Sequence, residues 1–195
     1  MISRVVLSVA VIASALLAGC NFLNEQPYRQ VDYFDLGSPV QYSLDGVTVK
    51  FMKFRGLEAA KYKMVYHEDD TRVLIDDYNK WVQPPGFMLN RFLQTSFSTN
   101  QNAATDNTRS YDVSGTLFEF KIDLKKQLVV LGVTYIIRDG NSNALPPLVE
   151  KSVSYTAPFK ERSGYAFSQA MTQAANKLTE SIYKDIKKIS SKKKK

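Results

Sequence analysis

Residues 164–189 carry an apolar side chain at every third or fourth position, and no other periodic segment of the chain is as long. This spacing gathers the apolar side chains on one face of an α-helix, which needs a second layer to pack against. Ala175 and Thr179 fall outside that predicted face. The chain is therefore expected to place one long helix on a layer formed by its other segments. The expected face consists of Phe167, Ala170, Met171, Ala174, Leu178, Ile182, Ile186 and Ile189.

Three segments before this helix have the patterns of β-strands. Residues 111–124 alternate, but the apolar positions change from odd to even, which predicts a β-bulge near Gly115. Residues 128–137 are apolar almost without interruption, which predicts a central strand covered on both faces. Residues 149–156 alternate cleanly between apolar and polar side chains, as a half-buried strand does.

The first half of the folded part adds four strands and a helix. Short strands are expected at 33–36 and 47–51, and a hairpin at 63–67 and 72–75. Two prolines, Pro84 and Pro85, precede a helical apolar pattern over 87–97, and proline suits the first turn of a helix. The order of elements predicts an α+β fold, with a mixed or mostly antiparallel sheet and two main helices packed on one face.

The amino end has the features of an export signal. Arg4 precedes a mostly apolar stretch that is too short to span a bilayer comfortably. Residues 17–20 (Leu-Ala-Gly-Cys) resemble the bacterial lipobox, which implies cleavage before Cys20 and acylation of that cysteine. An ordinary signal peptide followed by a chance cysteine is the alternative. By resemblance to the bacterial sorting rule, Asn21 favours the outer membrane over the inner membrane.

These features divide the chain into four parts. Residues 1–19 are expected to be a lipoprotein signal peptide and residues 20–32 a lipidated tether. Residues 33–189 are expected to form a single α+β domain, and residues 190–195 a disordered lysine tail. Two acyl chains give stable membrane anchoring, so the mature protein is expected to be anchored to the membrane without spanning it.

The net charge of +7 belongs to the carboxyl end, because residues 20–183 hold equal numbers of basic and acidic side chains. The lysine run is interpreted as a solvated tail, with contact to anionic lipid headgroups or lipopolysaccharide phosphates as the alternative. The balanced body and the export signal argue against a nucleic-acid partner. The candidate anionic-surface residues are Lys192, Lys193, Lys194 and Lys195.

The sequence offers little catalytic chemistry. It has one cysteine and one histidine, and the nucleotide-binding and nucleophile-elbow motifs are absent. We therefore expect no cofactor and no metal site. His67, beside three acidic residues, is interpreted as a solvated strand end, with a catalytic histidine as the alternative. Asp76 and Asp77 are interpreted as a solvated turn, with a cation site as the alternative.

Trp81, the only tryptophan, has two interpretations. It could fill the core where the second helix meets the sheet. It is also the candidate anchor of a protein–protein contact, because tryptophan is enriched at interfaces.

The stretch from Arg72 to Trp81, followed by the two prolines and the leucine-rich helix, resembles the ABC-type transport auxiliary lipoprotein family, of the paraquat-inducible lipoprotein C type. The early residues 33–36 and the closing segment 150–186 are similar to the family's first strand and final strand and helix. The lysine tail and the Asn-rich segment 98–110 depart from the family pattern.

The resemblance implies a non-enzymatic lipoprotein on the periplasmic face of the outer membrane. It would act as an auxiliary or docking subunit of an ABC/MCE-type (mammalian cell entry) intermembrane lipid transport system. The implied partner is the MCE-type tunnel protein, with a homo-oligomer as a further arrangement. A lipopolysaccharide-assembly or structural envelope lipoprotein is the alternative function, and a hydrolase using His67 is the third.

Overall fold

The structure, a computed structural model, describes residues 28–56, 61–98, 108–142 and 146–192. They form strands of one mixed sheet and two helices, which confirms the predicted α+β class. The predicted loop at 98–110 lies largely outside the described residues. The elements are β1 (Asp32–Phe34), β2 (Val47–Arg55), β3 (Lys63–His67), β4 (Val73–Trp81), α2 (Pro85–Ser96), β5 (Arg109–Asp123), β6 (Leu128–Asp139), β7 (Val149–Pro158) and α3 (Gly164–Lys192).

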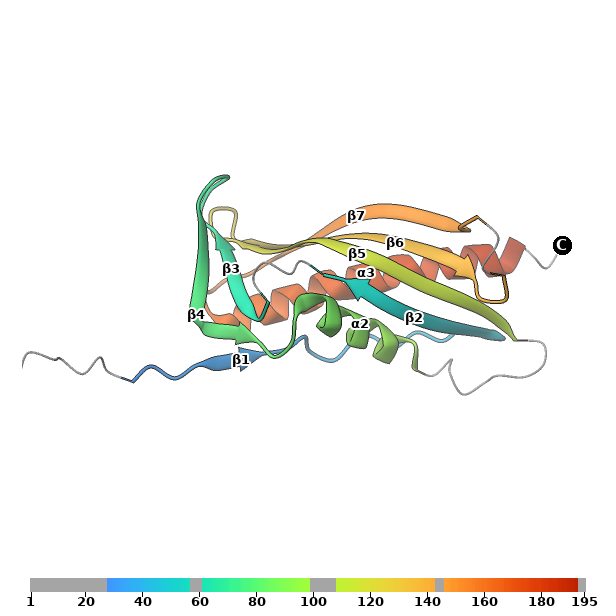
Figure 1. Cartoon of the computed structure of the whole chain (residues 1–195), viewed down its shortest axis with the longest axis horizontal. Coiled ribbons are helices and arrows are strands. Elements are labelled where there is room, and N and C mark those ends of the chain that lie inside the picture. Colours follow the sequence, from blue (N-terminus) through green and yellow to red (C-terminus); the bar gives the residue numbers. More distant parts are fainter. Residues whose placement is uncertain (1–27, 57–60, 99–107, 143–145, 193–195) are drawn as a thin grey trace, which may run out of the picture. The chain divides into compact units, whose positions relative to one another are not determined.

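Strand β5 is the axis of the sheet, since three other strands pair with it (Figure 1). On one edge it pairs antiparallel with β6, which in turn pairs antiparallel with β7. On its other edge it pairs in parallel with β2 along its first half and with β3 at its last residues. Strand β4 follows β3 antiparallel, and β1 pairs in parallel with β4. Strands β2 and β3 thus lie one after the other along the same edge of β5.

The two strands leave a break in that edge. The pairing of β2 ends at Thr116 of β5, and the pairing of β3 begins at Ile122. Among the described residues, the part of β5 between these points has no strand beside it on that edge. The end of β4 lies beside the residue that precedes β3, because backbone N–H of Trp81 donates to the carbonyl of Tyr62 at 2.6 Å.

The bulge predicted near Gly115 lies three residues further along β5. The register with β6 shifts between Leu117 and Glu119, so Phe118 is the extra residue. Buried side chains change from odd to even positions after this point, and Phe118 itself is exposed. Gly115 serves another purpose: a Cβ there would lie 2.5 Å from the Phe54 ring. The glycine allows β2 to pack closely against β5.

The predicted hairpin of β3 and β4 is confirmed, but β4 continues beyond its expected end. Val65 pairs with Ile75, and Lys63 pairs with Lys80. Four residues of β4 therefore lie opposite the single residue Met64 of β3, which makes a large, irregular bulge. After this bulge β4 resumes a regular course and ends at Trp81.

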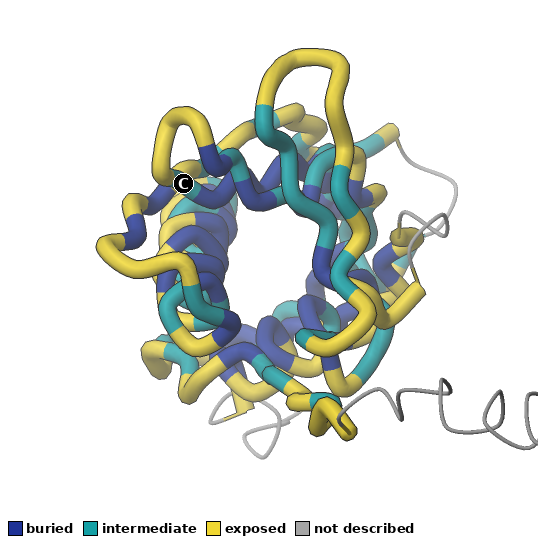
Figure 2. The backbone as a smooth tube through the Cα atoms, turned by 90° about the vertical axis from the view of Figure 1, so that its left-hand side faces the viewer, coloured by how far each residue is buried: buried dark blue, intermediate teal, exposed yellow. Residues whose placement is uncertain are grey.

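The amphipathic face of α3 is confirmed, and the buried surface is wider than predicted. Phe167, Met171 and Leu178 are buried as expected, but Ala175 and Thr179 are fully buried as well. The segment after β1 contacts an adjacent side of the helix. Backbone N–H of Gly37 donates to Thr172 Oγ1 at 2.9 Å, and that of Val40 to Asn176 Oδ1 at 3.0 Å. Figure 2 shows the buried inner side of this helix and its exposed outer side.

The end of α3 corrects one predicted boundary. The helix reaches Lys192, so residues 190–192 are helical instead of belonging to a disordered tail. The carbonyl of Ser190 accepts a hydrogen bond from Arg109 at the start of β5, which ties this last turn to the sheet. Residues 193–195 lie outside the described residues.

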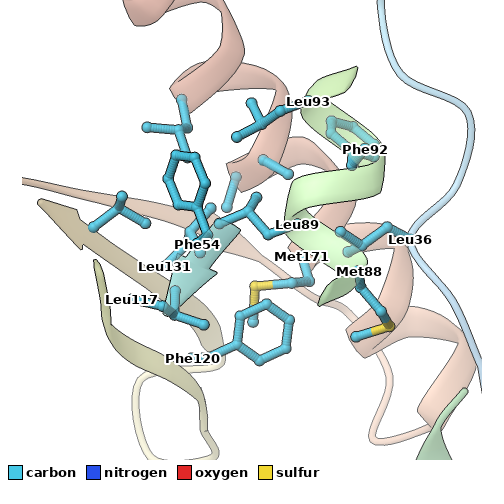
Figure 3. Close-up of a cluster of buried hydrophobic side chains, with 14 of the residues drawn as sticks. Leu36, Phe54, Met88, Leu89, Phe92, Leu93, Leu117, Phe120, Leu131 and Met171 are labelled. Carbon is cyan, nitrogen blue, oxygen red and sulfur yellow. The ribbon is translucent and has the colours of Figure 1, made fainter. Parts of the chain in front are cut away.

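Both helices and the sheet share one hydrophobic core. Strand β6 is buried on both faces over 129–133, as predicted, and alternates beyond them. Helix α2 begins at Pro85 as predicted, and its Met88, Leu89 and Leu93 are fully buried. Figure 3 shows these side chains meeting Met171 of α3 and Leu131 of the sheet. The start of α2 is thus fixed at one end of the core, beside the break in the sheet.

Candidate functional site

Trp81, the candidate partner anchor, lies in the core. Its side chain is 2% exposed. The indole meets the ring of Phe120 edge to face, with centroids 5.2 Å apart. Such aromatic pairs contribute about 0.5–1.5 kcal/mol beyond the burial of their area. The burial favours the core interpretation, because direct contact with a partner needs an exposed side chain.

A cleft opens beside this tryptophan, where the end of β2 crosses the start of α2. The two backbones approach closely through Gly56 and Gly86. A Cβ on Gly86 would lie 2.9 Å from the carbonyl oxygen of Phe54 and 3.1 Å from the Cα of Gly56. Any side chain larger than hydrogen would force the backbones apart. The two glycines therefore set the floor of the cleft.

Basic and aromatic side chains line this cleft, which we call the basic cleft and which has a volume of about 630 Å³. The lining residues that the structure describes include three cations and no carboxylate. Phe87, in the first turn of α2, is 53% exposed. The ammonium of Lys53 lies 5.3 Å from the centroid of the Phe87 ring, a cation–π contact. The lining residues are Lys53, Phe54, Arg55, Gly56, Lys61, Tyr62, Pro84, Gly86 and Phe87.

A second hollow of about 330 Å³, the adjoining hollow, lies at the break in the sheet and shares Lys61 with the basic cleft. Trp81 and Phe118 contribute to its walls, so the bulge in β5 helps to form it. Lys121, which also lines the hollow, pairs with Glu119 at 2.7 Å. The remaining lining residues are Lys63, Val65, His67, Pro85, Glu119 and Phe120.

These lining residues were not predicted from the sequence as a site. The one available signal was the i, i+2 spacing of Lys53 and Arg55, which places two cations on one side of a strand. The sequence does not show that Lys61 and Phe87 join them.

The bulge of β4 is held by Asp76, which the sequence places in a solvated turn. Its Oδ1 accepts the backbone N–H groups of Tyr78 and Asn79 at 2.8 and 3.0 Å. Its Oδ2 accepts the Tyr66 hydroxyl at 2.5 Å and the Asn79 amide at 2.7 Å. Burial opposes ionisation of this carboxyl, but the hydrogen bonds outweigh it and hold the pKa of Asp76 below its usual value.

Asp77, the neighbour of Asp76, points to a different partner. It pairs with Lys63 Nζ at 2.5 Å. The two carboxylates therefore serve separate contacts. No group of three or more metal-ligating side chains occurs in the part of the chain that the structure describes.

A polar network between α3 and the sheet was not predicted. The hydroxyl of Tyr135 donates to Asp185 Oδ2 at 2.6 Å, and Lys151 Nζ contacts both carboxylate oxygens at 2.6 Å. Burial, followed by the hydrogen bond to Asp185, raises the pKa of Tyr135 above its usual value. The network satisfies a buried carboxylate and ties β6, β7 and α3 together. Asp185 is almost buried, whereas Lys151 is half-exposed, so the network lies at the border between the core and solvent.

His67 ends β3 and is half-buried. Within the described residues its imidazole makes no hydrogen bond to a serine or a carboxylate. Its backbone carbonyl accepts the N–H of Leu124 at 2.9 Å. The structure thus places His67 on the wall of the adjoining hollow, without the neighbours of a catalytic triad.

The predicted lipidation and surface residues fall at the two ends. Cys20 and the signal peptide lie outside the described residues, as do Lys193, Lys194 and Lys195. Lys192 is the last residue of α3. In the described parts of the chain, neither helix combines the length and the apolar character needed to cross a bilayer.

Comparison with known proteins gives one family and several similar folds. The family described as ABC-type transport auxiliary lipoprotein component matches residues 59–183. No curated protein matches the chain in sequence. A crystal structure of a Xanthomonas campestris protein assigned to the DUF330 family superposes with a TM-score of 0.68 at 12% identity, covering 83% of this chain and 99% of that one. A crystal structure of an uncharacterized protein gives a TM-score of 0.63 at 12% identity, covering 81% and 99%. At such identities the likeness concerns the fold.

Proposed function

The chain belongs to the ABC-type transport auxiliary lipoprotein family, and from this membership we propose that it is the membrane-anchored docking subunit of an MCE-type lipid transport system. The match over residues 59–183 is the observation that carries the proposal. The matched part contains the lining residues of the basic cleft from Lys61 onward. It also contains the β3–β4 hairpin. The transporter would move phospholipid or a related hydrophobic cargo between the two membranes.

The anchor is the second part of the proposal. The lipobox at residues 17–20 supports acylation of Cys20, and Asn21 supports delivery to the outer membrane. The folded domain begins with β1 at Asp32. The segment from Cys20 to β1 reaches at most about 40 Å when fully extended. The domain would therefore work close to the periplasmic face of the membrane.

The docking role has a structural basis in β4. Residues 73–75 pair with β3 on one side, and among the described residues no strand pairs with their other side. Val73 and Ile75 are exposed there. An open strand edge with exposed apolar side chains is a template for addition of a strand from another protein. We assign this edge to the tunnel protein, with a second copy of the chain as the competing partner.

We also propose that the role is non-enzymatic. The basic cleft and the adjoining hollow are lined largely by cations and aromatic rings, which suit binding. Incubated with phospholipid vesicles, the purified chain should release no fatty acid and no headgroup. A hydrolysis product that disappears in a folded His67→Ala variant would contradict this part of the proposal.

Co-purification tests the docking function. The acylated full chain, extracted in mild detergent, should carry an MCE-domain subunit with it, and an Ile75→Lys variant should carry less. A Tyr165→Lys variant is the matched control, because Tyr165 is another exposed apolar residue and lies at the start of α3. Failure to recover any MCE-domain subunit with the wild-type chain would contradict the proposal.

A further inference from the structure

The cations of the basic cleft are not neutralised by carboxylates, whereas those of the neighbouring surface are. Lys63 and Lys121, which line the adjoining hollow, pair with Asp77 and Glu119. Among the residues that the structure describes, the cleft itself has no acidic lining residue. Among the described residues, Lys53, Arg55 and Lys61 make no ion pair, and the Lys53 ammonium lies over the Phe87 ring. Unpaired cations that converge on one hollow favour an anionic occupant.

The first turn of α2 adds to this field. The helix has no acidic residue in its first turn and no side-chain cap at Pro84. The N-terminus of a helix carries partial positive charge, which favours an anion. Gly86 lies in this turn, buried against Phe54 and Gly56, and it lines the cleft together with Pro84 and Phe87.

The same cleft exposes apolar surface. Phe87 and Tyr62 are large, and about half of each is exposed. The adjoining hollow continues past Lys61 along Phe118 and Trp81. An occupant that satisfied only the cations would leave these rings in water. An occupant that satisfied both must carry a negative group next to a hydrocarbon chain.

We propose that the basic cleft binds one molecule of anionic phospholipid. Its phosphate lies among Lys53, Arg55 and Lys61, and its acyl part lies on Phe87 and extends toward the adjoining hollow. The volume of about 630 Å³ falls within the range of small-molecule sites, roughly 300–1,000 Å³. This inference rests on the proposed function, because it makes the docking subunit a carrier of the transported class of molecule.

Trp81 provides the readout, because it is the only tryptophan of the chain and lines the adjoining hollow. The full acylated chain is reconstituted in vesicles of neutral phosphatidylcholine. It is then titrated with dihexanoyl-phosphatidylglycerol below its micelle concentration. We expect a saturable change in Trp81 emission. Dihexanoyl-phosphatidylcholine should bind at least about tenfold more weakly, because an anionic group gains from each nearby lysine or arginine.

Two triple variants separate a built site from general attraction. Lys53→Glu, Arg55→Glu and Lys61→Glu together should weaken binding at least about tenfold. The control combines Lys160→Glu, Lys187→Glu and Lys188→Glu, which make the same change of net charge at exposed positions outside the cleft. The control should stay within about twofold of the wild type. Equal weakening by the two triple variants would overturn the proposal.

Two further results would also overturn it: no saturable change with the wild type, or equal binding of the neutral and anionic lipids. A third result would also overturn it: the wild type binds no lipid, and the cleft triple variant loses the MCE-domain subunit. That result would assign the cleft to an acidic segment of a protein partner. Lipid binding by a chain that never recovers an MCE-domain subunit would support the lipid site and refute the docking function. The two proposals therefore fail separately.

Discussion

The indole of Trp81 and the ring of Phe120 meet edge to face with their centroids 5.2 Å apart. This contact joins the end of β4 to β5 at the place where β5 has lost its neighbouring strand. The tryptophan closes the core behind the break in the sheet, and the hollow in front of it remains open. Tryptophan is frequent at interfaces, but Trp81 is buried and supports the adjoining hollow from the core side.

Trp81→Ala should therefore act through stability. We expect a loss of about 3–5 kcal/mol in the free energy of unfolding, because a large buried ring is deleted. Trp81→Phe should recover much of it. Urea denaturation followed by circular dichroism measures both values. If Trp81→Ala unfolds like the wild type and yet fails to assemble, a direct contact with the partner would be indicated instead.

Gly86→Ala should destabilise the protein, although alanine favours helices over glycine by about 1 kcal/mol. The new Cβ would lie 2.9 Å from the Phe54 carbonyl oxygen, a backbone atom that cannot move alone. We expect a net loss of about 1–3 kcal/mol, measured by thermal and urea unfolding. Gly37→Ala is the control, since its Cβ would meet Thr172 at an ordinary 3.5 Å. Equal stability of the two variants would refute the close crossing of β2 and α2.

Asp76 should make stability depend on pH in the acid range. The folded state lowers the pKa of this carboxyl. Its contribution is therefore fully present above the unfolded pKa of about 3.9 and is lost as the pH falls through the lower folded value. At pH 6 we expect Asp76→Asn to cost about 1 kcal/mol, because hydrogen bonds to a charged, partly exposed group are lost.

The difference in stability between the wild type and Asp76→Asn should shrink as the pH is lowered from 5 to below 3. Urea unfolding at several pH values measures it. Asp77→Asn is the control, because its ion pair with Lys63 is exposed and contributes little. A difference that stays constant with pH would show that the carboxylate charge does not hold the β4 bulge.

The two partners of the ion pair between α3 and β7 should respond unequally to mutation. The Asp185 side chain is 11% exposed and that of Lys151 is 45% exposed. Removal of Lys151 leaves a carboxylate still bound by Tyr135, and water can reach the vacated side. We expect Lys151→Gln to cost about 1 kcal/mol and Asp185→Ala about 2–4 kcal/mol in the free energy of unfolding.

Tyr135→Phe should lie between these two values, because it removes the hydrogen bonds of the hydroxyl with Asp185 and Ser181 and keeps the ring. All three variants can be compared by urea denaturation, with one common slope for the dependence of the free energy of unfolding on urea concentration. If Lys151→Gln proved the most costly of the three, Asp185 would depend on the salt bridge rather than on the buried hydroxyl.

The docking edge gives a prediction for assembly. Val73→Lys and Ile75→Lys should each reduce recovery of the partner severalfold, because a charged side chain blocks strand addition at an open edge. Neither should change the free energy of unfolding by more than about 0.5 kcal/mol, since both positions are exposed. Pull-down yields, normalised to the recovered chain, measure the effect. Unchanged yields for both variants would assign docking to another surface.

The sequence alone was sufficient for features that depend on local pattern. The face of α3 from Phe167 to Ile186 follows from a period of 3.6 residues, and the start of α2 at Pro85 follows from the missing N–H of proline. The change of phase in β5 was visible as well, because alternation has a period of two. Its position was missed by three residues, since the apolar Phe118 looks like a core residue and only its exposure shows that it is the bulge.

Tertiary structure decided what those local patterns leave open. A strand pattern shows which side chains share a face, but it does not show which strand lies alongside. The placement of β2 and β3 on the same edge of β5 depends on contacts between residues far apart in sequence. That placement creates the break in the sheet, brings Lys61 to Phe87 and buries Trp81. Ala175 and Thr179 are buried beyond the predicted face of α3, and a distant segment contacts the same helix at Thr172 and Asn176.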